Sequence, residues 1–301
     1  MSSVIHTRGL VKRYGRTRAL DGLDLEVESG QVHGFLGPNG AGKSTTIRIL
    51  LGLARPSAGE ASVFDLDPWH DSVAVHRRIA SVPGDVSTWP NLSGGEAIDL
   101  IARLRGAKSH ESAYRAEKER LLEAFQFDPR KKGRAYSKGN RQKVALIAAF
   151  AVPAELYVLD EPTSGLDPLM EVMFRREIAR VRDAGATVLL SSHILSEVEQ
   201  LCDRVSIIRA GKIVETGTLA ELRHLTRTEV SFVATDASAA AGIPDAHDLT
   251  VEEGRAKFTI DSDNVASVLP ELSRRNVEGL RIEPPSLEEL FLRHYGEEVS
   301  R

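Results

Sequence analysis

A glycine-rich loop at residues 37–45 constrains this chain more than any other feature. It fits the pattern G-x-x-x-x-G-K-[ST] between a predicted strand (residues 31–36) and a predicted helix that runs through residue 51. Its residues are Gly37, Pro38, Asn39, Gly40, Ala41, Gly42, Lys43, Ser44 and Thr45. Glycines let backbone N–H groups turn toward phosphate oxygens, and the following helix adds its N-terminal dipole. We expect Lys43 to reach the β- and γ-phosphates of a nucleotide and Ser44 to offer its hydroxyl to Mg²⁺.

Two acidic residues, Asp160 and Glu161, follow a short apolar run at residues 156–159. A carboxylate at the end of a buried strand can hold Mg²⁺, and a second carboxylate can polarise an attacking water. Strand ends also carry acids simply as solvated caps, so the pair gains its meaning from the phosphate loop. We assign Asp160 to the metal and Glu161 to the general base.

The composition excludes several classes of protein. Lys plus Arg number 39 and Asp plus Glu number 43, a formal net charge of −4, whereas a general polyanion binder carries a basic excess. The single cysteine, Cys202, allows no internal disulfide and fits a reducing cytoplasm. The N-terminus has no apolar signal core, and the longest apolar run, residues 144–159, is too short to span a bilayer. We therefore expect neither secretion nor membrane insertion, and no nucleic-acid partner.

The pattern along the chain predicts two domains. Short apolar runs alternate with helical patterns over residues 1–223, which predicts an α/β core with a helical insertion at about residues 85–150. Residues 224–301 predict a small α+β domain. Further strands are expected at residues 156–159, 187–191, 205–209, 212–216, 230–234, 257–260 and 279–282. Further helices are expected at residues 264–275 and 286–294.

The order of these motifs resembles that of the ATP-binding subunits of ABC transporters, and the resemblance covers residues 4–223. The family carries an aromatic residue that stacks on adenine, and Tyr14 matches it, although a tyrosine can also simply end a strand. Residues 162–167 are similar to the family's D-loop, which implies that Asp167 lies at a dimer interface. Residues 191–193 are similar to the switch region, which implies that His193 contacts the γ-phosphate.

Two segments compete for the family's signature motif. Residues 92–96 read Leu-Ser-Gly-Gly-Glu, almost the family's LSGGQ, but they stand too soon after the phosphate loop and too far ahead of Asp160. We interpret Ser93 and Glu96 as a capping box. Residues 136–142 stand in the right place, and there Ser137 and Gly139 are the counterparts that would touch ATP bound to the opposite subunit. This Ser-Lys-Gly form resembles the branch that serves drug and small-molecule exporters.

One position departs from the family. A glutamine normally follows the strand near residues 80–82 and senses Mg²⁺ and the permease, but Gly84 stands there instead. Glycine has no side chain to coordinate anything. Asp85 can take over the role or can be a solvated turn residue. Replacing Asp85 with alanine distinguishes these two readings through ATPase activity and its Mg²⁺ dependence.

The resemblance implies an ATP-hydrolysing exporter motor that uses ATP and Mg²⁺. Its implied partners are an integral membrane permease and a second ATP-binding subunit, with a homodimer favoured. It would work as a peripheral protein at the cytoplasmic face of the membrane. Residues 285–292 are similar to the closing helix of an accessory domain in drug-exporter ATPases, with a role in dimerisation or regulation. The alternatives are a soluble ABC-type ATPase acting on ribosomes or DNA, and an unrelated P-loop kinase or GTPase.

Overall fold

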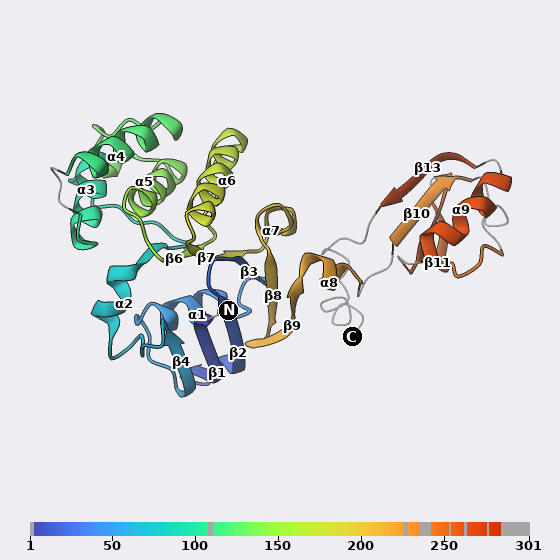
Figure 1. Ribbon diagram of the computed structural model, residues 1–301, viewed down its shortest axis with the longest axis horizontal. Coiled ribbons are helices and arrows are strands. Elements are labelled where there is room, and N and C mark those ends of the chain that lie inside the picture. Colours follow the sequence, from blue (N-terminus) through green and yellow to red (C-terminus); the bar gives the residue numbers. More distant parts are fainter. Residues whose placement is uncertain are drawn as a thin grey trace. The chain divides into compact units, whose positions relative to one another are not determined.

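The computed structural model describes residues 3–107, 111–224, 228–234, 242–252, 254–261, 264–275 and 277–283. The chain forms two compact units, Met1–Thr216 and Gly217–Arg301 (Figure 1). The helices of the first unit are α1 (Lys43–Leu50), α2 (Ser72–Arg78), α3 (Gly94–Leu104), α4 (Ser112–Ala124), α5 (Lys138–Phe150), α6 (Pro168–Asp183) and α7 (Leu195–Leu201). Its strands are β1 (Ser3–Tyr14), β2 (Thr17–Glu28), β3 (Val32–Leu36), β4 (Ala58–Val63), β5 (Ile79–Val82), β6 (Leu156–Asp160), β7 (Thr187–Ser192), β8 (Arg204–Arg209) and β9 (Lys212–Thr218), the last crossing the boundary between the units.

A six-stranded sheet with the order β5-β6-β7-β3-β8-β9 forms the centre of the first unit. The strands from β5 to β8 pair in parallel. Every residue of β3, β6 and β7 is buried. Burial on both faces explains the run of four apolar residues in β6, although β3 and β7 also bury polar residues such as His33 and Ser191. The predicted α/β core is confirmed. Parallel pairing also brings the carboxyl ends of β3, β6 and β7 to one edge, where the phosphate loop, the carboxylate pair and His193 follow them.

A second sheet, with the order β2-β1-β4, is antiparallel and was not anticipated from the sequence. Both β1 and β2 are 12 residues long, and their pairing contains several register shifts. In β1 such bulges interrupt the alternation of apolar and polar residues on which a strand assignment depends, whereas residues 23–28 of β2 keep it. This sheet carries Tyr14 at the last position of β1.

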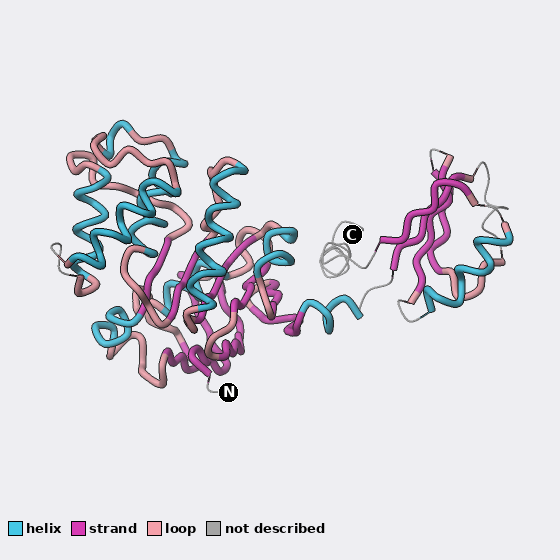
Figure 2. The backbone as a smooth tube through the Cα atoms, turned by 45° about the horizontal axis from the view of Figure 1, so that its top comes forward, coloured by secondary structure: helices cyan, strands magenta, loops and turns pink. Residues whose placement is uncertain are grey.

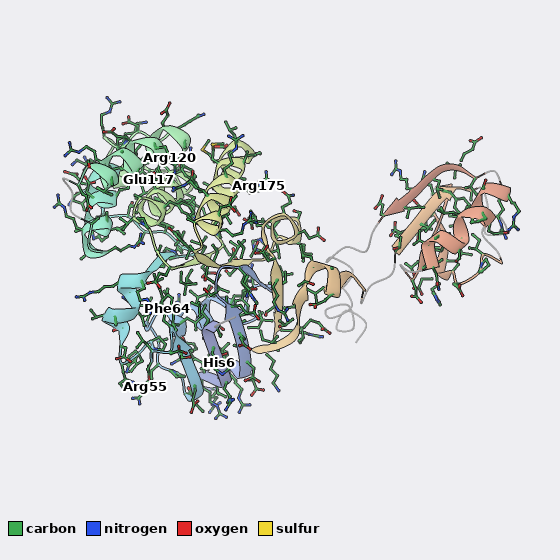
Figure 3. The ribbon with its side chains drawn as sticks, in the orientation of Figure 1. His6, Arg55, Phe64, Glu117, Arg120 and Arg175 are labelled. Atoms are coloured by element: carbon green, nitrogen blue, oxygen red, sulfur yellow. The ribbon has the colours of Figure 1, made fainter. Side chains whose placement is uncertain are left out.

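Helices α3, α4 and α5 form the helical insertion (Figure 1). A charged cluster joins α4 to α6: Arg120 pairs with Glu117 on its own helix and with Glu177 of α6, with N–O distances of 2.8 and 2.7 Å (Figure 3). Glu177 is buried, and Arg180 is its second partner at 3.0 Å. These ion pairs join α4 of the helical insertion to α6, the helix that follows Asp160 and Glu161.

The second unit is mainly antiparallel β structure. It contains α8 (Leu219–His224), β10 (Thr228–Val233), β11 (His247–Glu252), β12 (Arg255–Ile260), α9 (Val265–Arg274) and β13 (Glu278–Glu283). The sheet has the order β11-β12-β10-β13, and its helix lies beside it (Figure 2). Buried side chains of the sheet and of α9 form one hydrophobic cluster. The α+β prediction is confirmed, whereas β11 was missed and the expected helix at residues 286–294 lies outside the described residues.

Helices long and apolar enough to cross a bilayer are absent from the part of the chain that the structure describes.

Candidate nucleotide site

The phosphate loop connects β3 to α1 and depends on the absence of side chains at particular positions. Gly42, the residue before α1, has φ +118°, and a Cβ there would lie 2.9 Å from the Ala19 carbonyl oxygen. Gly37 is equally constrained, because a Cβ would lie 2.5 Å from the Ile208 carbonyl oxygen. Gly40 has φ +83° and faces open space. Glycine at positions 37 and 42 therefore lets the loop pack against Ala19 and Ile208 in the conformation of an anion-binding helix start.

Lys43 is buried at the first position of α1 and turns back over the loop. Its Nζ donates to the carbonyl oxygens of Gly37 and Pro38 and lies 3.8 Å from Glu161 Oε1. Burial lowers the pKa of the Lys43 ammonium, while the carboxylates of Glu161 and Asp160 act in the opposite direction. The loop thus holds a cation next to the carboxylate pair.

Asp160 and Glu161 have different surroundings although they are neighbours. Asp160 ends β6, is 6% exposed and accepts a hydrogen bond from the Ser191 hydroxyl. Glu161 has left the strand with a left-handed φ of 46°, and its N–H donates to the Ser191 carbonyl oxygen at 3.1 Å. The turn of the backbone separates the two carboxylates, so one is buried at the sheet edge and the other points toward Lys43 and His193.

His193 follows β7 and is brought to the same place. Its Nδ1 lies 3.2 Å from Glu161 Oε1, and its side chain is 46% exposed. Lys43, Glu161 and His193 come from three segments that are far apart in the sequence, and the structure joins them around a single carboxylate. The three residues belong to separate motifs in the sequence, and in the structure Lys43 and His193 both contact Glu161.

The residues assigned to Mg²⁺ can supply part of the coordination shell of that ion. The described residues contain no group of three or more His, Cys, Asp or Glu side chains that could hold a metal. Mg²⁺ usually takes one or two carboxylates and completes its coordination with water and substrate phosphates. An exposed Ser44 at the start of α1 and a buried Asp160 at the end of β6 supply such a partial set. The donors suit an ion that arrives with a nucleotide.

The two candidate signature segments differ in what their helix starts can bind. At α3, Ser93 accepts from Glu96 N–H and Glu96 accepts from Ser93 N–H, which confirms the predicted capping box. The Gly94 and Gly95 N–H groups donate to the carbonyl oxygens of Lys131 and Pro129 at 3.1 and 2.8 Å. The start of α3 therefore has no donor left for a phosphate.

At α5, Ser137 caps the helix by accepting from Asn140 N–H at 3.3 Å, and the first turn holds no acid. Among the described residues, the N–H groups of Lys138 and Gly139 have no hydrogen-bond acceptor. A Cβ on Gly139 would lie 2.5 Å from the Gly165 carbonyl oxygen. This helix start keeps free donors and touches the D-loop segment.

Gly84 lies against the buried carboxylate. A Cβ at this position would be 3.3 Å from Asp160 Oδ2, tighter than most Cβ contacts. Asp85 is exposed, and the structure gives it no hydrogen bond within the described residues. A glycine at the position of the missing glutamine therefore allows the backbone to approach Asp160 closely.

Other residues add support that sequence reasoning did not assign or assigned differently. Asp167 accepts from Met170 N–H at 3.0 Å and caps α6, and Tyr14 is 47% exposed beside Lys12, whose Nζ lies 4.9 Å from the ring centre. Sequence reasoning missed Ser191 as a partner of Asp160. It also missed Gln142, which is buried and donates to the Pro162 carbonyl oxygen at 2.8 Å. The only sequence signal for these two was their place next to assigned residues.

A cavity of about 970 Å³ lies apart from these groups. Its lining includes residues before or at the start of β5, β6 and β7, such as Arg78, Glu155 and Thr187, and no residue of the phosphate loop. Those residues mark the opposite ends of the strands from the assigned ones. The candidate nucleotide site lies at the carboxyl ends of these strands and does not coincide with this cavity.

Comparison with known families gives two matches that together span most of the chain. Residues 20–164 match the family described as ABC transporter. Residues 217–295 match the family described as ATP-binding protein DrrA1-3-like, C-terminal domain. The two matches fall in the two compact units.

Curated relatives resemble the chain along much of its length. The daunorubicin/doxorubicin resistance ATP-binding protein DrrA of Streptomyces peucetius is 42% identical over 221 residues, which cover 73% of this chain and 66% of DrrA. The daunorubicin resistance ATP-binding protein DrrA3 of Streptomyces coeruleorubidus is 35% identical, with 98% of this chain and 97% of DrrA3 covered. The bacitracin transport ATP-binding protein BcrA of Enterococcus faecalis is 31% identical, with the same coverage of 98% and 97%.

Solved structures agree on the first unit. The ATP-binding subunit of an ABC transporter superposes with a TM-score of 0.69 at 31% identity, covering 74% of this chain and 92% of that structure. A dimeric bacterial ABC transporter cassette gives a TM-score of 0.65 at 22% identity, covering 71% and 98%, and shows the shared fold. The chain therefore belongs to the ABC transporter family, as an ATP-hydrolysing, ATP-binding subunit similar along nearly its whole length to DrrA3 and BcrA.

Proposed function

We propose that this ATPase is the motor of an exporter and works as a head-to-tail dimer beneath a separate membrane permease. In the dimer, each ATP lies between the phosphate loop of one subunit and the start of α5 in the other. The observation that carries the proposal is the contact of Lys43 and His193 with Glu161, at 3.8 and 3.2 Å, in front of the phosphate loop. The free Lys138 and Gly139 N–H groups support the second half of the site.

The proposed reaction assigns a task to each residue of the chain. The phosphate loop and Lys43 bind the phosphates, and Tyr14 stacks on the adenine. Glu161 orients a water for in-line attack on the γ-phosphate, and His193 stabilises the charge that develops there. Bound through Ser44 and Asp160, Mg²⁺ would supply neutralisation of the phosphate charge. Ser137 and Gly139 of the opposite subunit hold the γ-phosphate until it is cleaved.

ATP binding then closes the dimer and hydrolysis opens it. The helical insertion at about residues 85–150 passes this motion to the permease, and Asp167 lies at the dimer interface. The second domain, residues 224–301, serves dimerisation or regulation. The names of the relatives, which concern daunorubicin, doxorubicin and bacitracin, support an antibiotic-like small molecule as cargo. A motor that drives a permease in this way would work as a peripheral protein at the cytoplasmic face of the membrane.

Replacing Glu161 with glutamine tests the dimer and the base together. The variant keeps the shape of the side chain but removes its charge, so it should bind ATP, fail to hydrolyse it and accumulate as a dimer with Mg²⁺ and ATP in light scattering. The exposed Glu60 on β4 offers a matched control, since Glu60→Gln should behave like the wild type. A Glu161→Gln variant that stays monomeric at saturating ATP would overturn the homodimeric sandwich.

Recovery of tagged wild-type protein from detergent-solubilised host membranes tests the transport role. A polytopic membrane protein in near-equal amount, identified by mass spectrometry, is the expected result. Recovery only with ribosomal or DNA-bound proteins would contradict the motor and favour a soluble ABC-type ATPase.

A further inference from the structure

We propose that Glu197 is a positioning residue for ATP hydrolysis, whose carboxylate fixes the loop that carries His193 beside Glu161. The inference rests on the proposed roles of His193 and Glu161. It adds a residue to which neither the sequence motifs nor the comparisons assign a task.

Glu197 contacts the loop that carries His193 through a side-chain hydrogen bond. Glu197 lies in the first turn of α7, immediately after that loop. Its Oε2 accepts a hydrogen bond from Ser192 Oγ at 2.7 Å. The same Oγ accepts from Ile194 N–H at 3.0 Å. The residues on both sides of His193 are therefore held through one hydroxyl, and Glu197 fixes the position of that hydroxyl.

The histidine loop also contacts Glu161, on both sides of Ser192. Glu161 N–H donates to the Ser191 carbonyl oxygen at 3.1 Å, and His193 Nδ1 lies 3.2 Å from Glu161 Oε1. Ser192, which Glu197 fixes, lies between these two contact residues. Glu197 therefore holds the segment that places the proposed γ-phosphate ligand beside the proposed base.

The charges around Glu197 make this an unusual place for an acid. Burial is the largest influence and raises its pKa, and Glu171 of α6 acts in the same direction. The Ser192 and Thr163 hydroxyls and His193 lower it, and Glu197 in turn raises the pKa of the buried Cys202. Glu197 Oε1 is buried and has no hydrogen-bond partner in the described part of the chain. A buried acceptor without a partner destabilises the fold, so a well-packed apolar residue would serve stability better.

A carboxylate kept at this position therefore serves something other than stability. Through the hydrogen bond from Ser192 to its Oε2, Glu197 sets the distance between His193 Nδ1 and Glu161 Oε1, which is 3.2 Å.

The test combines a nucleotide-free measurement with kinetics on the full chain. We expect Glu197→Ala to shift the imidazole NMR signal of His193, identified by its loss in a His193→Ala variant. We also expect kcat for ATP hydrolysis to fall about tenfold with little change in KM, because misplaced groups slow chemistry more than binding. Glu197→Gln keeps an acceptor for Ser192 and should recover most of both readouts. Ser196→Ala, an exposed position on the same helix, is the control and should match the wild type.

Two results would overturn the inference. In the first, Glu197→Ala leaves the His193 signal and kcat unchanged. In the second, the alanine and glutamine variants lose activity equally and in proportion to a lower melting temperature, which would show a purely structural role. The His193 signal is recorded without nucleotide or permease, so it separates failure of this inference from failure of the proposed export function.

Discussion

The starts of helices α3 and α5 are nearly alike in sequence and opposite in chemistry. Both begin after a serine, Ser93 or Ser137, whose hydroxyl accepts from the N–H group three residues later. Both carry glycine in the first turn. At α3 the remaining donors are used by the protein, whereas at α5 the Lys138 and Gly139 N–H groups have no acceptor among the described residues.

Charge separates the two helix starts further. The third residue of α3 is Glu96, whose pKa is lowered to about 2 by hydrogen bonds from Ser93 and by Lys132. The corresponding residue of α5 is the neutral Asn140, and Lys138 lies beside it. An anion is repelled at the first helix start and attracted at the second. Two helix starts with similar residues therefore differ in their capacity to bind an anion, because only α5 keeps N–H donors without an acceptor in the described part of the chain.

The largest effect should come from adding a side chain at Gly139, which lies against the D-loop segment at residues 162–167. In Gly139→Ala, a Cβ 2.5 Å from the Gly165 carbonyl oxygen must displace that segment. We expect kcat for ATP hydrolysis to fall about a hundredfold, because a shift of about 1 Å in a site can cost that much. The rate of phosphate release from ATP measures this fall in kcat.

The matched variant at the other helix is Gly94→Ala. There a Cβ would lie 2.5 Å from Tyr136 Oη and 2.6 Å from Phe127, within packed aromatic side chains. Its melting temperature should fall while the activity of the folded fraction is kept. Equal losses of activity in both variants would show that the two helix starts do not differ in function.

A smaller effect should come from giving α5 the acid that α3 possesses. Asn140→Glu places a carboxylate where the γ-phosphate of ATP is proposed to bind, and we expect KM for ATP to rise about tenfold through charge repulsion. The rise should diminish at high salt, because salt screens exposed charges. Asn140→Gln adds length without charge and should resemble the wild type in nucleotide titrations. An unchanged KM in Asn140→Glu would remove α5 from the nucleotide site.

The smallest effect concerns stability at α3. The pKa of Glu96 is lower in the folded chain than in the unfolded chain, so its stabilising contribution is complete above about pH 4.5 and is lost as the pH falls toward 2. Glu96→Gln should therefore melt below the wild type at pH 7, with a gap that narrows below pH 4.5. Thermal unfolding followed by circular dichroism measures the gap, and a pH-independent gap would contradict the capping role.

The parallel core was predictable because burial on both faces leaves a direct mark in the sequence. Strand β6 begins with four apolar residues, β3 and β7 contain shorter apolar stretches, and an assigned site residue follows each of the three strands in the chain. The β2-β1-β4 sheet was missed, although residues 23–28 of β2 alternate strictly between buried apolar and exposed acidic residues. Strand β1, where the register shifts, lacks such an alternation.

The candidate site also contains some residues that the sequence predicts and some contacts that it does not predict. Residues within a loop motif, such as Lys43 and Glu161, can be found from spacing and residue type. Contacts that depend on side-chain direction, such as Ser191 with Asp160 or Gln142 with the Pro162 carbonyl, leave no spacing rule in one sequence. The close approach of Gly84 to Asp160 is of this kind too, since only the fold shows what a missing side chain makes room for.

The left-handed backbone conformation of Glu161, the proposed catalytic base, lowers the stability of the chain. A φ of 46° is strained for any residue with a Cβ and costs on the order of 1 kcal/mol, whereas glycine adopts it freely. A chain selected for thermostability alone would therefore gain by losing its glutamate. A stabilised but inactive Glu161→Gly variant should arise readily in such a screen, and the persistence of glutamate at this position would then record selection for turnover over folding.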